Sequence, residues 1–154
     1  MPEASLLTDE VCALVGLETP MGRVQVTPKA FRRALEVYTG RIPRTAPAAG
    51  EPVPGYVLAA LDSESDTPAM PSLLPNSLLI SNEWQFERPL RMGEELESVY
   101  SVVAITERFG GRFGYSIDFR AEVTFKDADG NPVARSGRTM TQYSAAEARD
   151  EGDA

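Results

Sequence analysis

Side chains that transfer protons or bind metals are scarce in this sequence. Its 154 residues include no histidine and one cysteine, Cys12. A mechanism that needs imidazole as a base, an acid or a metal ligand cannot be completed by this chain alone. One cysteine forms no intramolecular disulfide, and no Cys or His cluster exists to hold zinc, so we expect no metal and no cofactor. Cys12 has no basic neighbour in the sequence, and we expect it to be a small buried hydrophobe.

The remaining groups that could do chemistry are carboxylates and arginines. Asp62, Glu64 and Asp66 form a short acidic run, which could supply a catalytic carboxylate but is more often the solvated end of a helix. Guanidinium groups can bind phosphate through two hydrogen bonds, and four arginines are candidates for that role: Arg41, Arg44, Arg88 and Arg91. Scattered arginines on an acidic chain are more often solvated or paired with carboxylates.

The charge and length of the chain limit its class. Fifteen Lys and Arg against 23 Asp and Glu give a formal charge of −8, which argues against a nucleic-acid partner. No signal-peptide pattern and no apolar run long enough for a membrane span are present, so we expect a cytoplasmic protein with no membrane partner. The length is that of one domain.

One helix is strongly indicated. Thr27 can cap it, Pro28 suits its first position, and Gly40 suits its end. Between them Phe31, Ala34, Leu35 and Tyr38 recur at the spacing of one helix face. The segment that follows, 41–54, holds four prolines and one glycine and is predicted to be a loop.

A second helical run is short and almost wholly apolar. It comprises Tyr56, Val57, Leu58, Ala60 and Leu61, opened by Pro54-Gly55 and closed by the acidic run. A helix that is apolar on nearly all sides should be buried. A Pro-rich stretch, 68–75, separates it from the rest of the chain.

The second half of the chain has the period of β-strands. Trp84 and Phe86 alternate with polar residues, a Val- and Ile-rich run spans 97–107, and apolar residues take every odd position from Phe113 to Phe125. Glycine-containing turns flank that last strand, and a further strand is predicted over 132–143. The acidic remainder, 144–154, is expected to be a flexible tail.

The order of these elements predicts an α+β domain over 1–143, with four consecutive antiparallel strands and room for another near the N-terminus. A short apolar helix before a curved antiparallel sheet can be buried on all sides only if the sheet wraps around it. That is the geometry of a single hot-dog domain, an antiparallel sheet wrapped around a central apolar helix.

Four segments together resemble the MaoC-like hydratases and dehydratases, and more closely the non-catalytic N-terminal-type half of their two-part members. The segments, which cover about residues 12–143, are Val15-Gly16, TPKAFRRALEVYTG, PGYVLAALDSE and NEWQFERPLRMGEEL. The resemblance implies a lyase role in fatty acid or polyketide metabolism. Similar proteins add or remove water across the 2,3 bond of an acyl chain held as a thioester on coenzyme A or acyl carrier protein.

One loop departs from the catalytic pattern of that family. Catalytic members carry Asp and His in a G-D-x-N-P-x-H type loop after the first helix, whereas this chain reads Gly40-Arg41-Ile42-Pro43-Arg44. With those groups missing, an independent hydratase of that mechanism is excluded. The resemblance then implies a catalytically silent subunit that pairs with a hot-dog chain bearing the Asp and His.

We expect no catalytic residue in the chain itself, and an acyl site whose candidate residues are Tyr38, Gly40, Arg41, Tyr56, Leu58, Trp84 and Phe86. For Tyr56, Leu58, Trp84 and Phe86 simple core packing is the competing explanation. Two alternatives stay open. One is a stand-alone hot-dog thioesterase using Asp62 or Glu64, and the other is a homodimer that binds acyl thioesters without chemistry.

Overall fold

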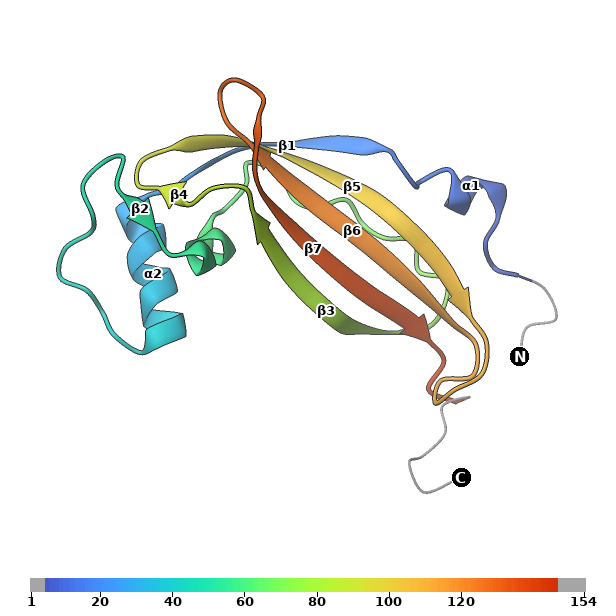
Figure 1. Cartoon of the computed structure of the whole chain (residues 1–154). Coiled ribbons are helices and arrows are strands. Elements are labelled where there is room, and N and C mark those ends of the chain that lie inside the picture. The colour runs from blue at the N-terminus through green and yellow to red at the C-terminus, as the bar shows by residue number, and fades with distance from the viewer. Residues whose placement is uncertain (1–4, 147–154) are drawn as a thin grey trace.

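The fold is built on one long antiparallel sheet. We describe residues 5–146 of a computed structural model. The five-stranded sheet has the order β1-β5-β6-β7-β3, and each strand runs antiparallel to its neighbours. Its strands are β1 (Glu18–Gln25), β3 (Asn76–Phe86), β5 (Glu95–Arg108), β6 (Ser116–Lys126) and β7 (Pro132–Tyr143). Figure 1 shows the strands running side by side along the molecule, with β1 and β3 at the two edges.

The remaining elements are short and gather mainly at one end of the sheet. They are α1 (Asp9–Cys12), α2 (Pro28–Thr39), β2 (Pro52–Val53), the 3₁₀ helix η1 (Gly55–Ala60) and β4 (Leu90–Arg91). Strand β2 pairs with β4 in a separate two-stranded sheet. In Figure 1, α2, β2, β4 and η1 form a lobe beside the sheet, and α1 lies apart from them.

Helix α2 begins and ends where the sequence predicts. The side chain of Thr27 accepts a hydrogen bond from the backbone N–H of Ala30 at 3.1 Å, and Pro28 takes the first helical position. Gly40 ends the helix in the left-handed conformation, with φ of 72°, and its N–H donates to the carbonyl of Glu36. Phe31 and Ala34 are buried, as the spacing predicts.

Alternation along β6 gives the sheet two different faces. Ile117, Phe119 and Ala121 are buried on what we call the inner face, which is covered by η1 and the segment 61–75. The opposite, outer face carries charged residues that pair with one another. There Arg120 contacts Glu83 and Glu122. Because apolar side chains are buried on one face alone, apolar and polar residues alternate regularly along this strand.

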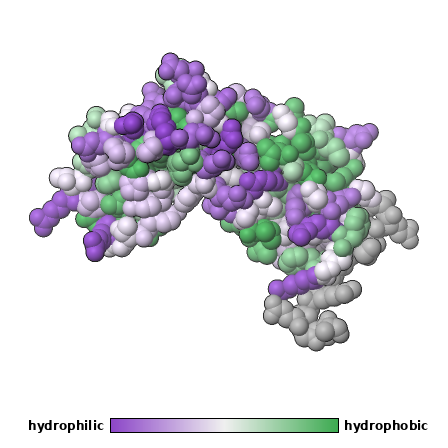
Figure 2. Space-filling model, in the orientation of Figure 1, coloured by the Kyte–Doolittle hydropathy of each residue, from purple (hydrophilic) through white to green (hydrophobic). Residues whose placement is uncertain are grey.

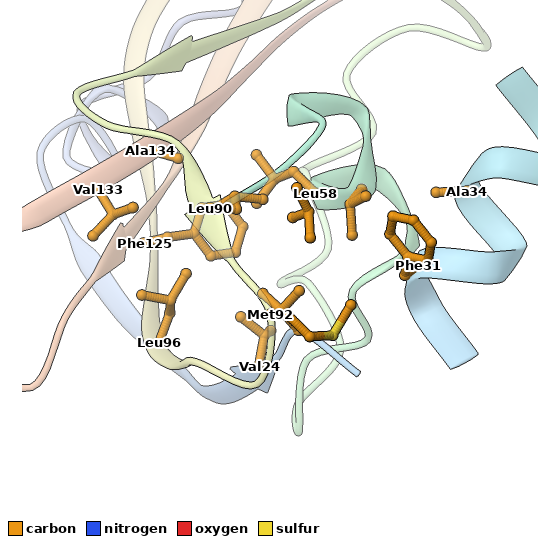
Figure 3. Close-up of a cluster of buried hydrophobic side chains, with 13 residues drawn as sticks. Val24, Phe31, Ala34, Leu58, Leu90, Met92, Leu96, Phe125, Val133 and Ala134 are labelled. Atoms are coloured by element: carbon orange, nitrogen blue, oxygen red, sulfur yellow. The ribbon is translucent and has the colours of Figure 1, made fainter. Parts of the chain in front are cut away.

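The main core lies where the lobe meets the sheet. Phe31 of α2, Leu58 of η1 and Leu90 of β4 pack into one cluster of buried side chains. Figure 3 shows Leu58 between Leu90 and Phe31, with side chains of β5, β6 and β7 completing the cluster. This cluster fixes the lobe against one end of the sheet.

The element expected at the centre of the sheet is shorter than a typical central helix. The apolar run 56–61 forms a six-residue 3₁₀ helix in which Val57 and Leu58 are buried, whereas Ala59 is exposed and Tyr56 is half-buried. Pro54 before it and the acidic run after it leave too few residues for a longer helix. The α+β antiparallel fold is confirmed, but the prediction that this helix is buried on all sides is wrong.

The segment 61–75 covers the inner face where a longer helix would lie. Leu73 and Leu74 pack against the buried cluster of Tyr115, Ile117 and Phe119. Gln142 of β7 fastens the segment to the sheet. Its side-chain oxygen accepts from the backbone N–H groups of residues 73 and 74 at 2.8 and 3.2 Å, and its amide nitrogen donates to the carbonyl of residue 71 at 2.7 Å.

Three smaller predictions have different outcomes. Strand β7 begins and ends as predicted, but β6 begins at Ser116 and not at Phe113. Gly114 has φ of 65°, outside the extended range, and Phe113 packs on Tyr143 instead. Cys12 is exposed, so its predicted burial is wrong. It lies in a four-residue helix whose buried residue is Val11.

Two further predictions concern the C-terminal tail and membrane-spanning helices. The predicted tail, 144–154, lies outside the described residues beyond residue 146. No helix within residues 5–146 has the length and apolar character that crossing a bilayer requires.

Candidate functional site

A hollow lies on the inner face between η1 and the strands. Its volume is about 270 Å³, near the lower end of the roughly 300–1,000 Å³ of ligand pockets. Leu58 and Ala59 of η1 form one wall, and Trp84 of β3 and Phe125 of β6 form others. The hollow lies where η1 ends after six residues and the segment 61–75 begins.

A second hollow continues beneath the segment 61–75. Its volume is about 360 Å³, and it lies between residues such as Met70 and Leu74 of that segment and Phe119 and Met140 of the sheet. Both hollows are lined by Thr67, Tyr100 and Arg138. We call the two together the inner-face groove.

Strand register explains which residues meet in the groove. Trp84 of β3 pairs with Ser136 of β7, which pairs with Val123 of β6, and Val123 pairs with Tyr100 of β5. Directly opposite partners in a sheet point to the same face, so these four side chains form a row across the inner face. Arg138 belongs to the neighbouring row.

Tyr100 and Arg138 are, together with Thr67, the polar groups at the middle of the groove. Tyr100 is 5% exposed, and burial raises the pKa of its phenol, an effect that the positive charge of Arg138 partly offsets. Arg138 is exposed and is the one charged residue among the described residues that line the groove. The groove therefore offers hydrogen-bond donors but no group that can take a proton at neutral pH.

Three of the predicted site residues meet in an aromatic cluster at one end of the groove. The ring of Tyr38, from the last turn of α2, stacks on Tyr56 of η1 with centroids 5.0 Å apart. The same ring meets Trp84 edge to face at 6.1 Å. Tyr38 is 49% exposed, so this cluster joins the core to the surface.

Leu58 and Phe86, two further predicted site residues, belong to the core. Leu58 is 5% exposed within the main cluster, and Phe86 packs against that cluster. The ring of Phe86 lies so close to Gly55 that a Cβ at position 55 would stand 2.9 Å from its carbon atoms. Leu58 also lines the groove, whereas Phe86 supports η1 from behind.

Gly40 and Arg41, the remaining predicted site residues, stand at the exit of α2. Arg41 is exposed, and its backbone N–H donates to the hydroxyl of Thr39 at 3.3 Å. Neither residue lines the groove, and of the other five predicted residues only Leu58 and Trp84 do.

Two of the arginines considered for phosphate binding instead donate hydrogen bonds to groups of this chain. Arg88 donates to both carboxylate oxygens of Glu94, at 2.8 and 3.2 Å, and these hydrogen bonds raise its pKa. Arg91 donates to the carbonyl of Gly50 at 3.1 Å. Arg41 and Arg44 are exposed.

The candidate carboxylates Asp62 and Glu64 are both exposed and lie outside the groove. They line a separate polar pocket of about 300 Å³ beside the first turn of α2, together with Lys29 and Arg33. A carboxylate among cations and water is well solvated, which is a poor setting for a nucleophile or a base.

Sequence reasoning missed Tyr100 and Arg138. A signal was present, because both residues occupy positions where the strand alternation places side chains on the inner face. Arg138 is the one charged residue among the inward positions of β7, which otherwise carry Ala134, Ser136, Met140 and Gln142.

The two edges of the sheet differ in a way that bears on partners. Strand β1 carries Pro20, which has no N–H to donate, and an irregularity in its pairing next to that residue. Strand β3 has eleven residues and no proline, and Leu78, Leu79 and Ile80 are 45–49% exposed along it. Figure 2 shows apolar residues along the lower margin of the sheet, where β3 runs in Figure 1. This free, apolar edge is the surface best suited to pairing.

Comparison with known proteins identifies the fold. No family model matches the chain, and no curated protein matches it. A solved structure, the MaoC-like dehydratase from Rhodospirillum rubrum, matches with a TM-score of 0.56 over 88% of this chain and 94% of the other, at 20% identity. The chain has a hot-dog fold, as that structure does.

Two further matches to hot-dog proteins are partial. The truncated HadBC (3R-hydroxyacyl-ACP dehydratase) complex from Mycobacterium tuberculosis matches at 19% identity over 42% of this chain and 43% of the other, with a TM-score of 0.36. The ChsH1–ChsH2 complex from the same organism matches at 12% identity over 49% and 40%, with a TM-score of 0.41. This chain thus matches less than half the length of each of those two chains.

Proposed function

We propose that this chain is a catalytically silent hot-dog subunit of a 3-hydroxyacyl-thioester dehydratase or enoyl-thioester hydratase. Its partner is a hot-dog chain that carries the Asp and His at the exit of its first helix. The observation that carries the proposal is the chemistry of the inner-face groove, where no imidazole or carboxylate is found among the described lining residues. Arg138 and Tyr100 are its ionisable groups.

Adding water across a double bond requires a group that removes a proton and one that returns it. The guanidinium of Arg138 donates hydrogen bonds and has no acceptor atom, so it is not a base. The pKa of Tyr100 is raised from 10.0, so its phenol also keeps its proton. Since the chain has no histidine, these two residues cannot replace the missing base. The proton transfer is therefore assigned to the partner.

The free edge β3 supports a partner of the same fold. An unpaired strand leaves alternate N–H and C=O groups that a second edge strand can satisfy. Leu78, Leu79 and Ile80 add apolar surface that pairing would remove from water. The surface continues onto α2 through Tyr38, which contacts Trp84 of β3.

In this account the silent subunit shapes the acyl site. Trp84 and Leu58 line the groove, and Tyr38 contacts both Trp84 and Tyr56 beside it. An acyl chain that enters between the subunits would lie on these side chains. Coenzyme A and a carrier protein would present the same thioester to the groove, so the proposal includes either carrier.

Reconstitution tests the proposal. The purified chain alone should not hydrate crotonyl or longer enoyl thioesters, whereas mixing it with a histidine-bearing hot-dog chain from the same genome should give activity. The partner's own Asp→Asn and His→Gln variants should abolish that activity. Thioester hydrolysis by the chain alone, lost in Asp62→Asn or Glu64→Gln, would show a thioesterase instead. Binding without turnover, with or without a second chain, would indicate a homodimeric binding module.

A further inference from the structure

Arg138 stands in the inner-face groove without an opposite charge. Its neighbours across the sheet are Asn82 of β3 and Ala121 of β6, neither of which is a carboxylate. No hydrogen bond or ion pair to Arg138 exists within the described residues 5–146. The guanidinium therefore faces the groove with all its donors available.

Two arginines on the outer face of the same sheet are paired with carboxylates. Arg120 donates to Glu83 at 3.0 Å, and Arg108 pairs with Asp118 at 3.2 Å. The carboxylates that these two arginines contact, Glu83 and Asp118, lie on the outer face and do not line the groove. No carboxylate within the described residues 5–146 is paired with Arg138, so none of them supplies its counter-charge.

Tyr100 supplies a second donor at the same place. The residue is 5% exposed, yet its hydroxyl has no hydrogen-bond partner within the described part of the chain and is not sealed from solvent. Tyr100 and Arg138 both line both hollows of the groove, so they stand where the hollows meet. Burial raises the pKa of the phenol, so it remains a donor at neutral pH.

Apolar side chains lie on either side of this pair, next to uncharged polar ones. Trp84, Val123 and Phe125 line one hollow and Met70, Phe119 and Met140 line the other, and each hollow also has polar lining residues, such as Ser136 and Ser77. Two donors between two uncharged hollows that offer apolar contacts match a ligand with an anionic oxygen group attached to an apolar chain. A neutral hydrocarbon chain would displace water from the guanidinium without replacing the hydrogen bonds that the water makes, which would lower its affinity.

We propose that Arg138 and the Tyr100 hydroxyl bind a carboxylate carried by the acyl chain, remote from its thioester. The groove then prefers acyl groups that bear a second, negatively charged oxygen function over plain fatty acyl groups. Arg138 is a specificity residue in this account and takes no part in proton transfer. The inference rests on the proposed function only in naming the ligand as an acyl thioester.

Binding to the chain alone tests this preference. The probes are the N-acetylcysteamine thioesters of dodecanoic acid and of dodecanedioic acid, of which the second alone keeps a free carboxylate. Trp84, the one tryptophan of the chain, lines the groove and reports occupancy by its fluorescence. We expect the dodecanedioyl probe to bind about tenfold more tightly, the value of one charge-assisted hydrogen bond of about 1.4 kcal/mol.

Variants assign the preference to the two residues. Arg138→Met should abolish the preference, Arg138→Lys should keep part of it, and Tyr100→Phe should reduce it about threefold. Arg135→Met is the matched control. Arg135 lies three residues before Arg138 on the same strand, so its side chain projects from the outer face. Thermal melting of each variant establishes that it is folded.

Four outcomes would overturn the inference. They are equal affinity of the two probes for the unmodified chain, a preference that survives in Arg138→Met, an equal loss in Arg135→Met, and no saturable binding of either probe. If Arg138→Met instead weakened assembly with the hot-dog partner and left probe binding unchanged, the counter-charge would come from a partner carboxylate. None of these measurements needs turnover, so failure here is distinct from failure of the reconstitution.

Discussion

Tyr38 and Trp84 meet edge to face with their ring centroids 6.1 Å apart, which joins the last turn of α2 to the free edge strand β3. Tyr56 also stacks on Tyr38, with ring centroids 5.0 Å apart. The three rings connect the buried core to the surface on which we expect a partner to dock. One contact thus links the lobe to the proposed acyl site.

Trp84→Ala should lower the free energy of unfolding by about 2 kcal/mol, less than the 3–5 kcal/mol of a fully buried Trp because the side chain is half-buried. Trp84→Phe should cost less, since most of the ring contact with Tyr38 remains. Urea denaturation followed by circular dichroism measures both values. Equal stability of Trp84→Ala and the unmodified chain would mean that the aromatic cluster contributes nothing to the fold.

Ile80→Lys should prevent pairing along β3, because a lysine at the strand edge would place a charge in the apolar interface. We expect the assembled species to shift to the monomer in size-exclusion chromatography with light scattering. Val103→Lys is the matched control. Val103 is also exposed, at 36%, but lies on β5, which has neighbours on both sides. If both variants assembled alike, the interface would lie elsewhere.

Gly40→Ala should destabilise the chain by about 1 kcal/mol. Gly40 ends α2 with φ of 72°, and a Cβ there would meet no atom within 4 Å, so backbone strain is the cost. Gly40→Asn should recover part of the loss, because Asn tolerates the left-handed conformation. Thermal denaturation measures both. A larger loss of stability in Gly40→Asn than in Gly40→Ala would contradict this explanation.

Glu107 should make stability depend on acid pH. Ser5 and Tyr115 donate hydrogen bonds to its carboxylate, and these hold its pKa below the ordinary value of 4.5. Because the folded pKa is the lower one, the stabilisation is complete above about pH 4.5 and is lost as the pH falls through the lowered value.

The melting temperature of Glu107→Gln should therefore lie below that of the unmodified chain at pH 7, and the two should converge in acid. Glu97→Gln, on the same strand but exposed, is the control and should follow the unmodified chain throughout. A difference that stayed constant down to pH 2 would rule out this linkage.

Sequence predicted the elements better than the site, for a physical reason. The ends of α2 depend on Thr27, Pro28 and Gly40, which act through local hydrogen bonds and dihedral angles. Strand β6 follows from its alternation, and only its start differs, where Gly114 takes a positive φ. Such signals are contained within a few residues of the sequence.

The inner-face groove depends on contacts between distant residues and could not be predicted in the same way. It exists because η1 stops after six residues and Gln142 holds the segment 61–75 across the sheet, 69 residues away in sequence from Leu73. Of the predicted site residues, Tyr38, Tyr56 and Trp84 come together, whereas Arg41 stands outside the groove. Tyr100 and Arg138 emerge only when the register of four strands is known.

The most direct test of the account is a steady-state assay of enoyl-thioester hydration, with the chain alone and with a histidine-bearing hot-dog partner. We predict no turnover above the uncatalysed rate for the chain alone and full activity for the pair. Sustained hydration by the isolated chain, purified free of other enzymes, would contradict the claim that the proton-transfer groups belong to a second subunit.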